Sequence, residues 1–417
     1  MSYVLFFVYL ILFAWLLTKI KFVNNSGLST KIIIGLFVLK VLTGCVYALI
    51  MMEKNGLADT IYFHKEGLKE YHLLLNDPKQ YVINFFHSGY QNGYDGLLSS
   101  QNSYWKDLQG NMIIRFLSVC NVFSFGNYYV NVIFYNFVIF FGGIGLYRVY
   151  DSIYPNKSFL LVSTCFLLPS LLIYTSTIHK EGLIFAAIGL AVYNMYAMLN
   201  KNRFAWWRLI YILLAITFIF LQRNYVLLAM LPAILAWVVV SKKKYSPFLT
   251  FLIIYFLGIF IFFTVQFLSP KINLPQSIIN KQADFQQFST ASTYVQLDTL
   301  QPNFKSFILN APQAFGHGFL RPFITDIKLS ASLFPLALEI FIYEIVFLFF
   351  IFFRDEKVFA DPFICFGFFF AMSILLIIGY TIPIIGAIVR YRSIYLPFLL
   401  TPVLCTINWQ KIKQLFT

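Results

Sequence analysis

Residues 251–268 have the sequence Phe-Leu-Ile-Ile-Tyr-Phe-Leu-Gly-Ile-Phe-Ile-Phe-Phe-Thr-Val-Gln-Phe-Leu. This stretch carries no charge, and its length matches a helix that crosses a hydrocarbon core ~30 Å thick. Backbone amides find no water there, so the segment should be a helix that satisfies its own hydrogen bonds. A transmembrane β-strand would instead alternate apolar and polar residues over about ten positions. The stretch therefore predicts an α-helical membrane protein.

Similar apolar runs recur along the whole chain. Hydrophobic residues make up 59% of it and charged residues 12%, with 50 Phe and 27 Tyr, which excludes an ordinary soluble domain. We expect spans near residues 3–19, 32–52, 128–148, 158–177, 182–199, 205–221, 224–240, 247–268, 331–353, 362–381 and 393–408. Residues 1–417 are thus predicted to form a single all-α membrane domain, a polytopic bundle of about eleven transmembrane helices.

Basic residues cluster in every second loop. Lys19 and Lys21, Lys201 and Arg203, and residues 242–244 form such clusters, whereas the short loops between them carry few Lys or Arg. Because cytoplasmic loops are enriched in these residues, the N-terminus is predicted outside and the C-terminus in the cytoplasm. The formal net charge of +14 would suggest nucleic acid in a soluble protein. Here the cytoplasmic loops explain it, so no nucleic-acid partner is expected.

Two long segments, residues 53–127 and 269–330, fall on the predicted outer side. Loops of this length are usually functional or disordered. Their aromatic content favours ordered caps that contain short helices, and residues 112–123 are amphipathic enough to lie in the membrane interface. The first segment also contains the Tyr-, Asn- and Gly-rich stretch 87–96.

Asp59 follows the second predicted span closely, in the apolar and aromatic stretch from Leu57 to His64. A partly desolvated carboxylate there has a raised pKa, which suits a general base. The alternative interpretation is that Asp59 is a solvated acid at a helix end, or the N-cap of a helix over residues 60–75. We predict Asp59 as a catalytic base and His64 as a substrate contact.

The run His179-Lys180-Glu181 occupies a tight turn between two predicted spans. Ionisable side chains at a membrane surface are candidates for function. Lys180 can hold a phosphate as a point charge, and Glu181 or His179 can orient an acceptor. The alternative is an interfacial loop whose lysine extends to the lipid headgroups.

Arginines recur on the predicted outer side. Arg223 lies in another tight turn, Arg390 and Arg392 lie just before the last predicted span, and His317 and Arg321 end the second long segment. Arginine on this side runs against the charge bias of membrane proteins. Its planar fork of donors matches phosphate oxygens. Together these residues predict a site for a lipid-linked phosphate, although a headgroup contact would explain any one of them.

Several kinds of site are not indicated by the sequence. The five Cys fall in or beside apolar segments and form no C-x-x-C pair, so they are interpreted as packing residues. Nucleotide-binding and hydrolase motifs are absent, and five scattered His do not predict a zinc site. We expect no cofactor and no metal, and no residues stand out as ligands for a divalent ion. An activated substrate on the outer face should therefore be carried by lipid.

The candidate residues follow a definite order along the chain. Asp59 lies in the first large outer loop, the ionisable turn follows Pro169-Ser-Leu-Leu-Ile-Tyr-Thr-Ser-Thr-Ile, Arg223 comes next, and Val389-Arg-Tyr-Arg precedes the last span. This order resembles multi-spanning glycosyltransferases of the GT-C class, especially the mannosyltransferase-like and arabinosyltransferase-like branch of bacterial envelope pathways. The resemblance covers most of the membrane domain and implies a bacterial inner-membrane enzyme with a polyprenyl-phosphate sugar donor and a glycan or lipid acceptor.

In that class an acid of the first outer loop acts as the base toward the acceptor hydroxyl. Carried over, Asp59 would be this base, Glu181 a second polar contact, and Lys180, Arg223 and Arg390 the groups that hold the donor phosphate. The sequence departs from the class in three ways. A span precedes the first outer acid, no second acid stands beside Asp59, and the second turn carries Glu in place of Asp. The acceptor and the metal requirement therefore stay open.

Two other functions fit the same pattern. An O-antigen or exopolysaccharide polymerase also has large outer loops and arginines, and it releases a lipid pyrophosphate. A lipid-linked oligosaccharide flippase or other transporter should instead place charges near the bilayer midplane and show internal repeats. Only Lys40 is clearly deep in a span, and its polar partner is not evident from the sequence. This favours an enzyme that works at the membrane surface.

Overall fold

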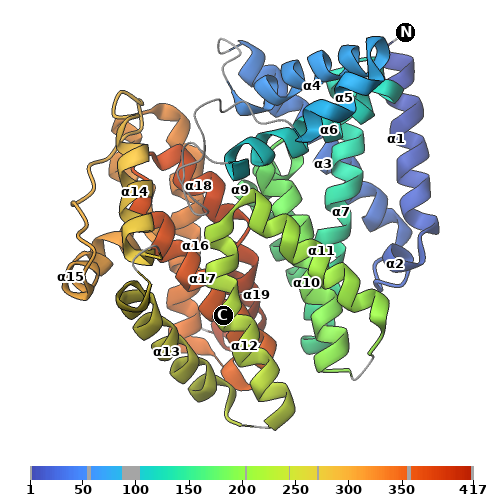
Figure 1. The fold of residues 1–417 in the computed structure, drawn as a ribbon. Coiled ribbons are helices and arrows are strands. Elements are labelled where there is room, and N and C mark those ends of the chain that lie inside the picture. The colour runs from blue at the N-terminus through green and yellow to red at the C-terminus, as the bar shows by residue number, and fades with distance from the viewer. Residues whose placement is uncertain are drawn as a thin grey trace. The chain divides into compact units, whose positions relative to one another are not determined.

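The computed structural model describes residues 2–53, 58–86, 104–201, 204–243, 245–269, 272–354 and 358–414 (Figure 1). Within these ranges the chain is helical, and the only β-contacts are two isolated bridges, Tyr294 with Ile384 and Arg354 with Ile407. The chain divides into two compact units. Unit 1 comprises Met1–Ser152, Cys165–Met195 and Phe204–Asn224, and unit 2 comprises Ile153–Thr164, Tyr196–Arg203 and Tyr225–Thr417. The single membrane domain expected from the sequence stays a prediction.

Unit 1 is a bundle of apolar helices with a layer of more polar helices. Its helices are α1 (Ser2–Lys19), α2 (Lys21–Asn24), α3 (Thr30–Glu53), α4 (Asp59–Asn76), α5 (Pro78–Phe86), α6 (Tyr104–Ser124), α7 (Tyr128–Ile153), α9 (Pro169–Ser176), α10 (Lys180–Leu199) and α11 (Trp206–Gln222). Helices α4, α5 and α6 lie across the end of the bundle at which α1 begins (Figure 1).

The layer formed by α4–α6 is tied together by specific contacts. A Cβ on Gly67 of α4 would lie 2.9 Å from the Cβ of Leu117, so the glycine lets α4 and α6 approach closely. Arg115 of α6 forms a 2.7 Å ion pair with Glu70 of α4. The short helices expected in the first long segment are therefore present. The stretch 87–96 lies outside the described residues.

Unit 2 contains the remaining helices. They are α8 (Ser158–Val162), α12 (Asn224–Lys243), α13 (Pro247–Leu268), α14 (Leu274–Gln286), α15 (Phe304–Phe315), α16 (Phe334–Phe353), α17 (Pro362–Thr381), α18 (Ile385–Ser393), α19 (Leu396–Thr406) and α20 (Trp409–Gln414), with the π-helix η2 (Gly316–Leu320) and the short 3-10 helices η3 (Ile324–Lys328), η4 (Ala331–Leu333) and η5 (Val358–Ala360). The π-helix η1 (Ser163–Leu167) joins α8 to α9. Gln282 of α14 ties this helix to the end of α17, because its side-chain amide donates to Tyr380 O at 2.9 Å.

Among the described residues, seven helices are long and apolar enough to cross a membrane, and the number rises to nine if each of two bent pairs is one span. The protein is therefore an all-α, multi-pass membrane protein. Two further apolar segments, Tyr3–Lys19 and Trp206–Gln222, are shorter than a full span. All the predicted ranges coincide with apolar helices or bent pairs, but the finer count of eleven stays a prediction.

The two bent pairs differ from the straight spans that the sequence suggested. Residues 158–167 and 169–176 meet at 50°, and residues 385–393 and 396–406 meet at 64°. Pro169 and Pro397 each lie in the first turn of the second helix of the pair, where the missing N–H costs no hydrogen bond. The last predicted span, near 393–408, corresponds to α19, the second helix of its pair. Arg390 and Arg392 lie inside α18 and not in a loop.

Candidate functional site

In unit 1, polar side chains gather around the turn that joins α9 to α10. The ammonium group of Lys40, on α3, donates to the hydroxyls of Thr175 at 2.7 Å and Ser176 at 3.1 Å. Lys40 is only 4% exposed, so these two hydroxyls supply the partners that a buried charge requires. Asn136 of α7 donates to Ser176 O at 2.8 Å. The end of α9 is therefore held by side chains from two other helices.

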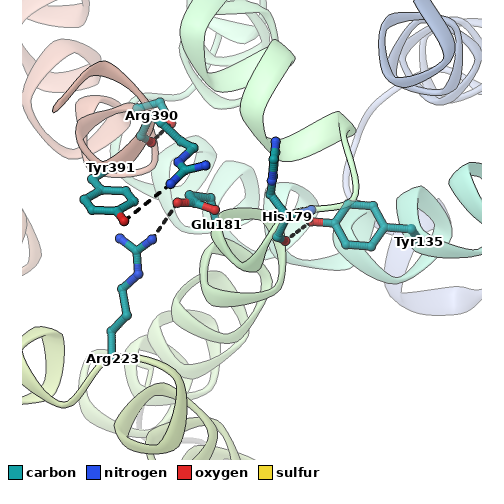
Figure 2. A network of polar contacts seen from close by, with 7 residues as sticks. Tyr135, His179, Glu181, Arg223, Arg390 and Tyr391 are labelled. Atoms are coloured by element: carbon teal, nitrogen blue, oxygen red, sulfur yellow. Dashed lines mark hydrogen bonds and ion pairs between the residues drawn. The ribbon is translucent and has the colours of Figure 1, made fainter. Parts of the chain in front are cut away.

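The next residues of the turn are fixed by Tyr135 of α7. Its hydroxyl donates to the main-chain oxygen of His179 and accepts from the main-chain N–H of the same residue at 3.3 Å (Figure 2). Gly182 faces this hydroxyl, and the space holds no room for a Cβ. The backbone at the start of α10 is thus locked in one position.

The imidazole of His179 is packed inside unit 1. It is 2% exposed, and its ring lies 5.9 Å from that of Tyr47 in an edge-to-face arrangement. This packing favours a structural role for His179 over the predicted contact with an acceptor. The residue instead shapes the turn that presents its two neighbours, Lys180 and Glu181.

A buried ion pair joins the two tight turns that the sequence singled out. Arg223 Nη2 lies 2.5 Å from Glu181 Oε1 (Figure 2), and the two residues are 8% and 2% exposed. Glu181 lies in the first turn of α10, where the helix dipole favours a negative charge. Arg223 follows the last residue of α11. Removing one partner would leave the other charged and buried, which is strongly destabilising.

The sequence pointed to both residues but not to their pairing. A usable signal was present, because α10 and α11 are consecutive helices. The start of the first and the end of the second lie at the same end of an antiparallel pair. Opposite charges in those two turns should therefore meet, and the direct contact of Glu181 with Arg223 in unit 1 shows that they do.

Lys180 lies against the helix that carries Asp59. Its ammonium nitrogen is 5.7 Å from the ring centroid of Phe63 on α4, a distance at which a cation is attracted to an aromatic face. Asp59 and Phe63 are one helical turn apart and share a face of α4. The predicted base and the predicted phosphate-binding lysine are therefore brought to the same part of unit 1.

Two expectations about Asp59 itself are wrong. The residue before it, Ala58, is the N-cap of α4, and Asp59 is already the first helical residue, so it is not the cap. Its side chain is exposed, so it is not the partly desolvated carboxylate that the aromatic stretch predicted. An exposed carboxylate at the start of α4 is accessible to a substrate hydroxyl.

His64 lies on the neighbouring face of α4, buried against α7. It is 9% exposed, and its ring stands edge-to-face on Tyr128 at 5.2 Å. The Tyr128 hydroxyl is 2.5 Å from that of Thr60. Burial lowers the pKa of His64 to about 4, so the imidazole is neutral near pH 7. This geometry favours a packing role over the predicted substrate contact.

Arg392 in unit 2 is a structural residue. It is 1% exposed, and its Nη1 lies 2.6–3.3 Å from the main-chain oxygens of Gly318, Phe319 and Arg321. These carbonyls end the π-helix η2, where orphan acceptors need donors. A guanidinium used in this way favours support of η2 over the predicted binding of substrate.

Three further sequence candidates also lie in unit 2. His317 is 7% exposed, and Arg321 has its Nη1 3.6 Å from Asp326 Oδ1. Arg390 is half-buried on α18, with its guanidinium carbon 5.1 Å from the ring centroid of Tyr391 and its Nη2 3.4 Å from the Tyr391 hydroxyl (Figure 2). The candidates thus divide into six residues in unit 1 and four in unit 2.

Within the described part of the chain, no group of three or more His, Cys, Asp and Glu side chains is arranged to hold a metal ion. Unit 2 has a partly open pocket of about 250 Å³, and Phe319, Phe347 and Phe398 are among its lining residues. All the residues around this cavity are apolar, so it offers no group for acid–base chemistry.

Comparison of the chain with protein-family models, with curated proteins and with solved structures found no match. The function must therefore be argued from the residues of the two units.

Proposed function

We propose that this protein is a membrane glycosyltransferase that moves a sugar from a polyprenyl-phosphate donor to a glycan or lipid acceptor on the extracytoplasmic face. We also propose that the protein has about eleven spans, belongs to the GT-C class and lies in a bacterial inner membrane. The main support for the proposed transfer lies in unit 1, where the exposed acid Asp59 shares a face of α4 with Phe63, whose ring Lys180 contacts. The next residue after Lys180 is Glu181, which forms the buried pair with Arg223.

The chemistry needs a base near the acceptor and cations near the leaving group. The acceptor oxygen attacks the anomeric carbon of the donor while Asp59 takes the hydroxyl proton. The bond from that carbon to the phosphate oxygen breaks, and the phosphate leaves with the bonding electrons. Positive groups placed in advance stabilise the charge that develops there. Lys180 and Arg223 are the candidates for this role in unit 1.

The buried pair suits this role through its rigidity. Glu181 fixes the orientation of the Arg223 guanidinium, which carries five N–H donors and can bridge a carboxylate and a phosphate. The backbone of the same turn is locked by Tyr135. Fixed donors cost little reorganisation during the reaction, whereas mobile ones would have to be ordered first.

The proposal is tested by complementation of a deletion strain. Glycans and lipid-linked sugars are analysed in cells that carry the native protein, Asp59→Asn or Asp59→Glu. We expect Asp59→Asn to abolish transfer and to accumulate the lipid-linked sugar, and Asp59→Glu to restore part of it, because only the carboxylates accept a proton. The two variants differ little in size, and both should be present in membranes at the native level. Full transfer by Asp59→Asn would remove the base and with it the proposed mechanism.

A transporter is a second candidate, and one observation favours it. The helix pair of α8 and α9 is broken, and the ammonium of Lys40 binds hydroxyls at the end of α9. Broken helices with charges near the midplane are typical of transport sites. The two functions are separated by the sidedness of the accumulated lipid-linked sugar. A blocked transferase leaves it on the outer leaflet, whereas a blocked flippase leaves it on the inner leaflet.

A further inference from the structure

A pair of basic side chains in unit 2 lies outside the mechanism proposed above. His317 is part of the π-helix η2, and Arg321 follows its last residue. Isolated π-helical turns are frequent at functional sites. Burial, together with the nearby charge of Arg321, lowers the pKa of His317 to about 4. His317 is therefore neutral near pH 7 and can donate through one ring nitrogen.

Both side chains present buried nitrogen atoms that find no hydrogen-bond partner in the described residues. These atoms are Nδ1 of His317, whose residue is 7% exposed, and Nε and Nη1 of Arg321. Native proteins rarely leave such groups unpaired, and each exception calls for an explanation such as an ion or ligand. Each of these three nitrogen atoms can donate a hydrogen bond to an acceptor oxygen.

The backbone that carries the pair is held rigidly. Arg392 binds the carbonyls of Gly318, Phe319 and Arg321, and it is 1% exposed. Gly318 packs against the backbone of α17 so closely that no Cβ fits. A site on such a preorganised segment binds its ligand without the cost of ordering it first.

Two carboxylates oppose an anion at this place. Asp326 lies 3.6 Å from Arg321 Nη1, beyond hydrogen-bonding distance, and its Oδ2 accepts the Phe323 N–H at 2.8 Å. Asp298 is exposed, and its charge acts on His317. The two carboxylates lower the affinity of this place for an anion. The Asp326 carboxylate also anchors the loop beside Arg321. The positive charges of Arg321 and Arg392 offset the negative charges of Asp298 and Asp326.

We propose that His317 and Arg321 form a binding site for a phosphate group in unit 2. A phosphate group presents several acceptor oxygens around one phosphorus atom, which matches nitrogen atoms on two side chains better than a planar carboxylate does. The site takes the phosphate of a lipid or free phosphate, since the same oxygens are recognised in both. Phosphate binding at this site requires no glycosyl transfer, so it can be tested independently of the proposed enzyme function.

The test measures binding to the purified full-length protein in nanodiscs of zwitterionic lipid. The probes are farnesyl phosphate, inorganic phosphate and farnesol, and each variant is compared with the native protein. Arg321→Gln is compared with Arg354→Gln, which removes an exposed arginine of the same unit. We expect Arg321→Gln to weaken the binding of the phosphate probes about tenfold or more, because a hydrogen bond to a charged group is lost.

The pattern among the probes identifies the ligand. A loss confined to farnesyl phosphate assigns the site to a lipid phosphate, and an equal loss for inorganic phosphate assigns it to the phosphate group alone. His317→Gln provides a second variant if Arg321→Gln does not fold, and it should weaken the same probes. The site is overturned if neither phosphate probe binds, if farnesol binds equally well, or if Arg321→Gln and His317→Gln bind as tightly as Arg354→Gln.

Discussion

Asp59, Phe63 and His64 show how helix phase separates neighbouring residues. Asp59 and Phe63 share the face of α4 near Lys180, whereas His64 is turned toward Tyr128. The sequence marked Asp59 and His64 together because they lie in one aromatic stretch. The prediction that Asp59 is partly desolvated was wrong, because exposure depends on how α4 is rotated against α7.

The burial of His64 makes the stability of the protein depend on pH. Its pKa in the folded protein is about 4, below the ordinary value of 6.5. Between these two pH values the unfolded chain binds a proton that the folded chain does not. The free energy of unfolding should therefore rise by up to about 3 kcal/mol as the pH increases from about 4 to 6.5. Thermal unfolding of the detergent-solubilised protein over this range measures the effect.

The contribution of His64 is isolated by replacement with phenylalanine. His64→Phe keeps an aromatic ring against Tyr128 and removes the proton-binding group, so the rise in unfolding temperature with pH should be smaller. His72 lies on the same helix but is exposed, and His72→Phe is the matched control. An unchanged pH dependence of the unfolding temperature in His64→Phe would contradict the role of His64. An equal reduction of that pH dependence in His72→Phe would contradict it as well.

At the scale of helices, the apolar runs predicted most elements correctly. The runs 247–268 and 362–381 coincide with α13 and α17 because long uncharged segments have no other way to satisfy their backbone in a membrane. The bends were not predicted, since an apolar run does not show where its axis changes direction. Pro169 and Pro397 mark the sites, but proline is also common at the start of straight helices such as α13, which begins at Pro247.

Arg392 and Arg390 belong to one helix and should respond differently to substitution. Arg392→Met leaves three main-chain oxygens around η2 without their donor, and we expect it to lower the free energy of unfolding by about 3 kcal/mol or more. Arg390 is half-buried, so part of its side chain stays in contact with solvent, whereas Arg392 is 1% exposed. Arg390→Met should therefore cost much less. Thermal unfolding of the two purified variants checks this, and equal destabilisation would show that η2 does not depend on Arg392.

For the whole molecule, charge placement predicts the sidedness of the chain, while the structure shows which of its ionisable residues are buried. The alternation of basic loops could be followed in sequence because it depends only on which loop a lysine occupies. The partners of Lys40 and the pairing of Glu181 with Arg223 depend on contacts between helices far apart in sequence. Such contacts are set by side-chain packing, so the sequence did not predict what each of these residues touches.

The predicted orientation can be tested with single cysteines and a membrane-impermeant maleimide. The native thiols interfere little, because Cys120, Cys165, Cys365 and Cys405 are buried, and burial raises the pKa of Cys120 to about 12. Cys45 is partly accessible and is replaced by serine in every protein, including the control that carries no added cysteine. Exposed positions are available in both units, namely Asn25 and Lys79 in unit 1 and Lys243 and Gln296 in unit 2.

Lys79→Cys and Gln296→Cys should be labelled in intact cells, because both lie in segments predicted outside. Asn25→Cys and Lys243→Cys lie in predicted cytoplasmic loops and should be labelled only after the membrane is permeabilised. The same pattern in both units would place Asp59 and Arg321 on the outer side without any assumption about how the units are arranged. The reverse pattern would put Asp59 in the cytoplasm, where sugar nucleotides are available, and the argument for a lipid-linked donor would then lose its basis.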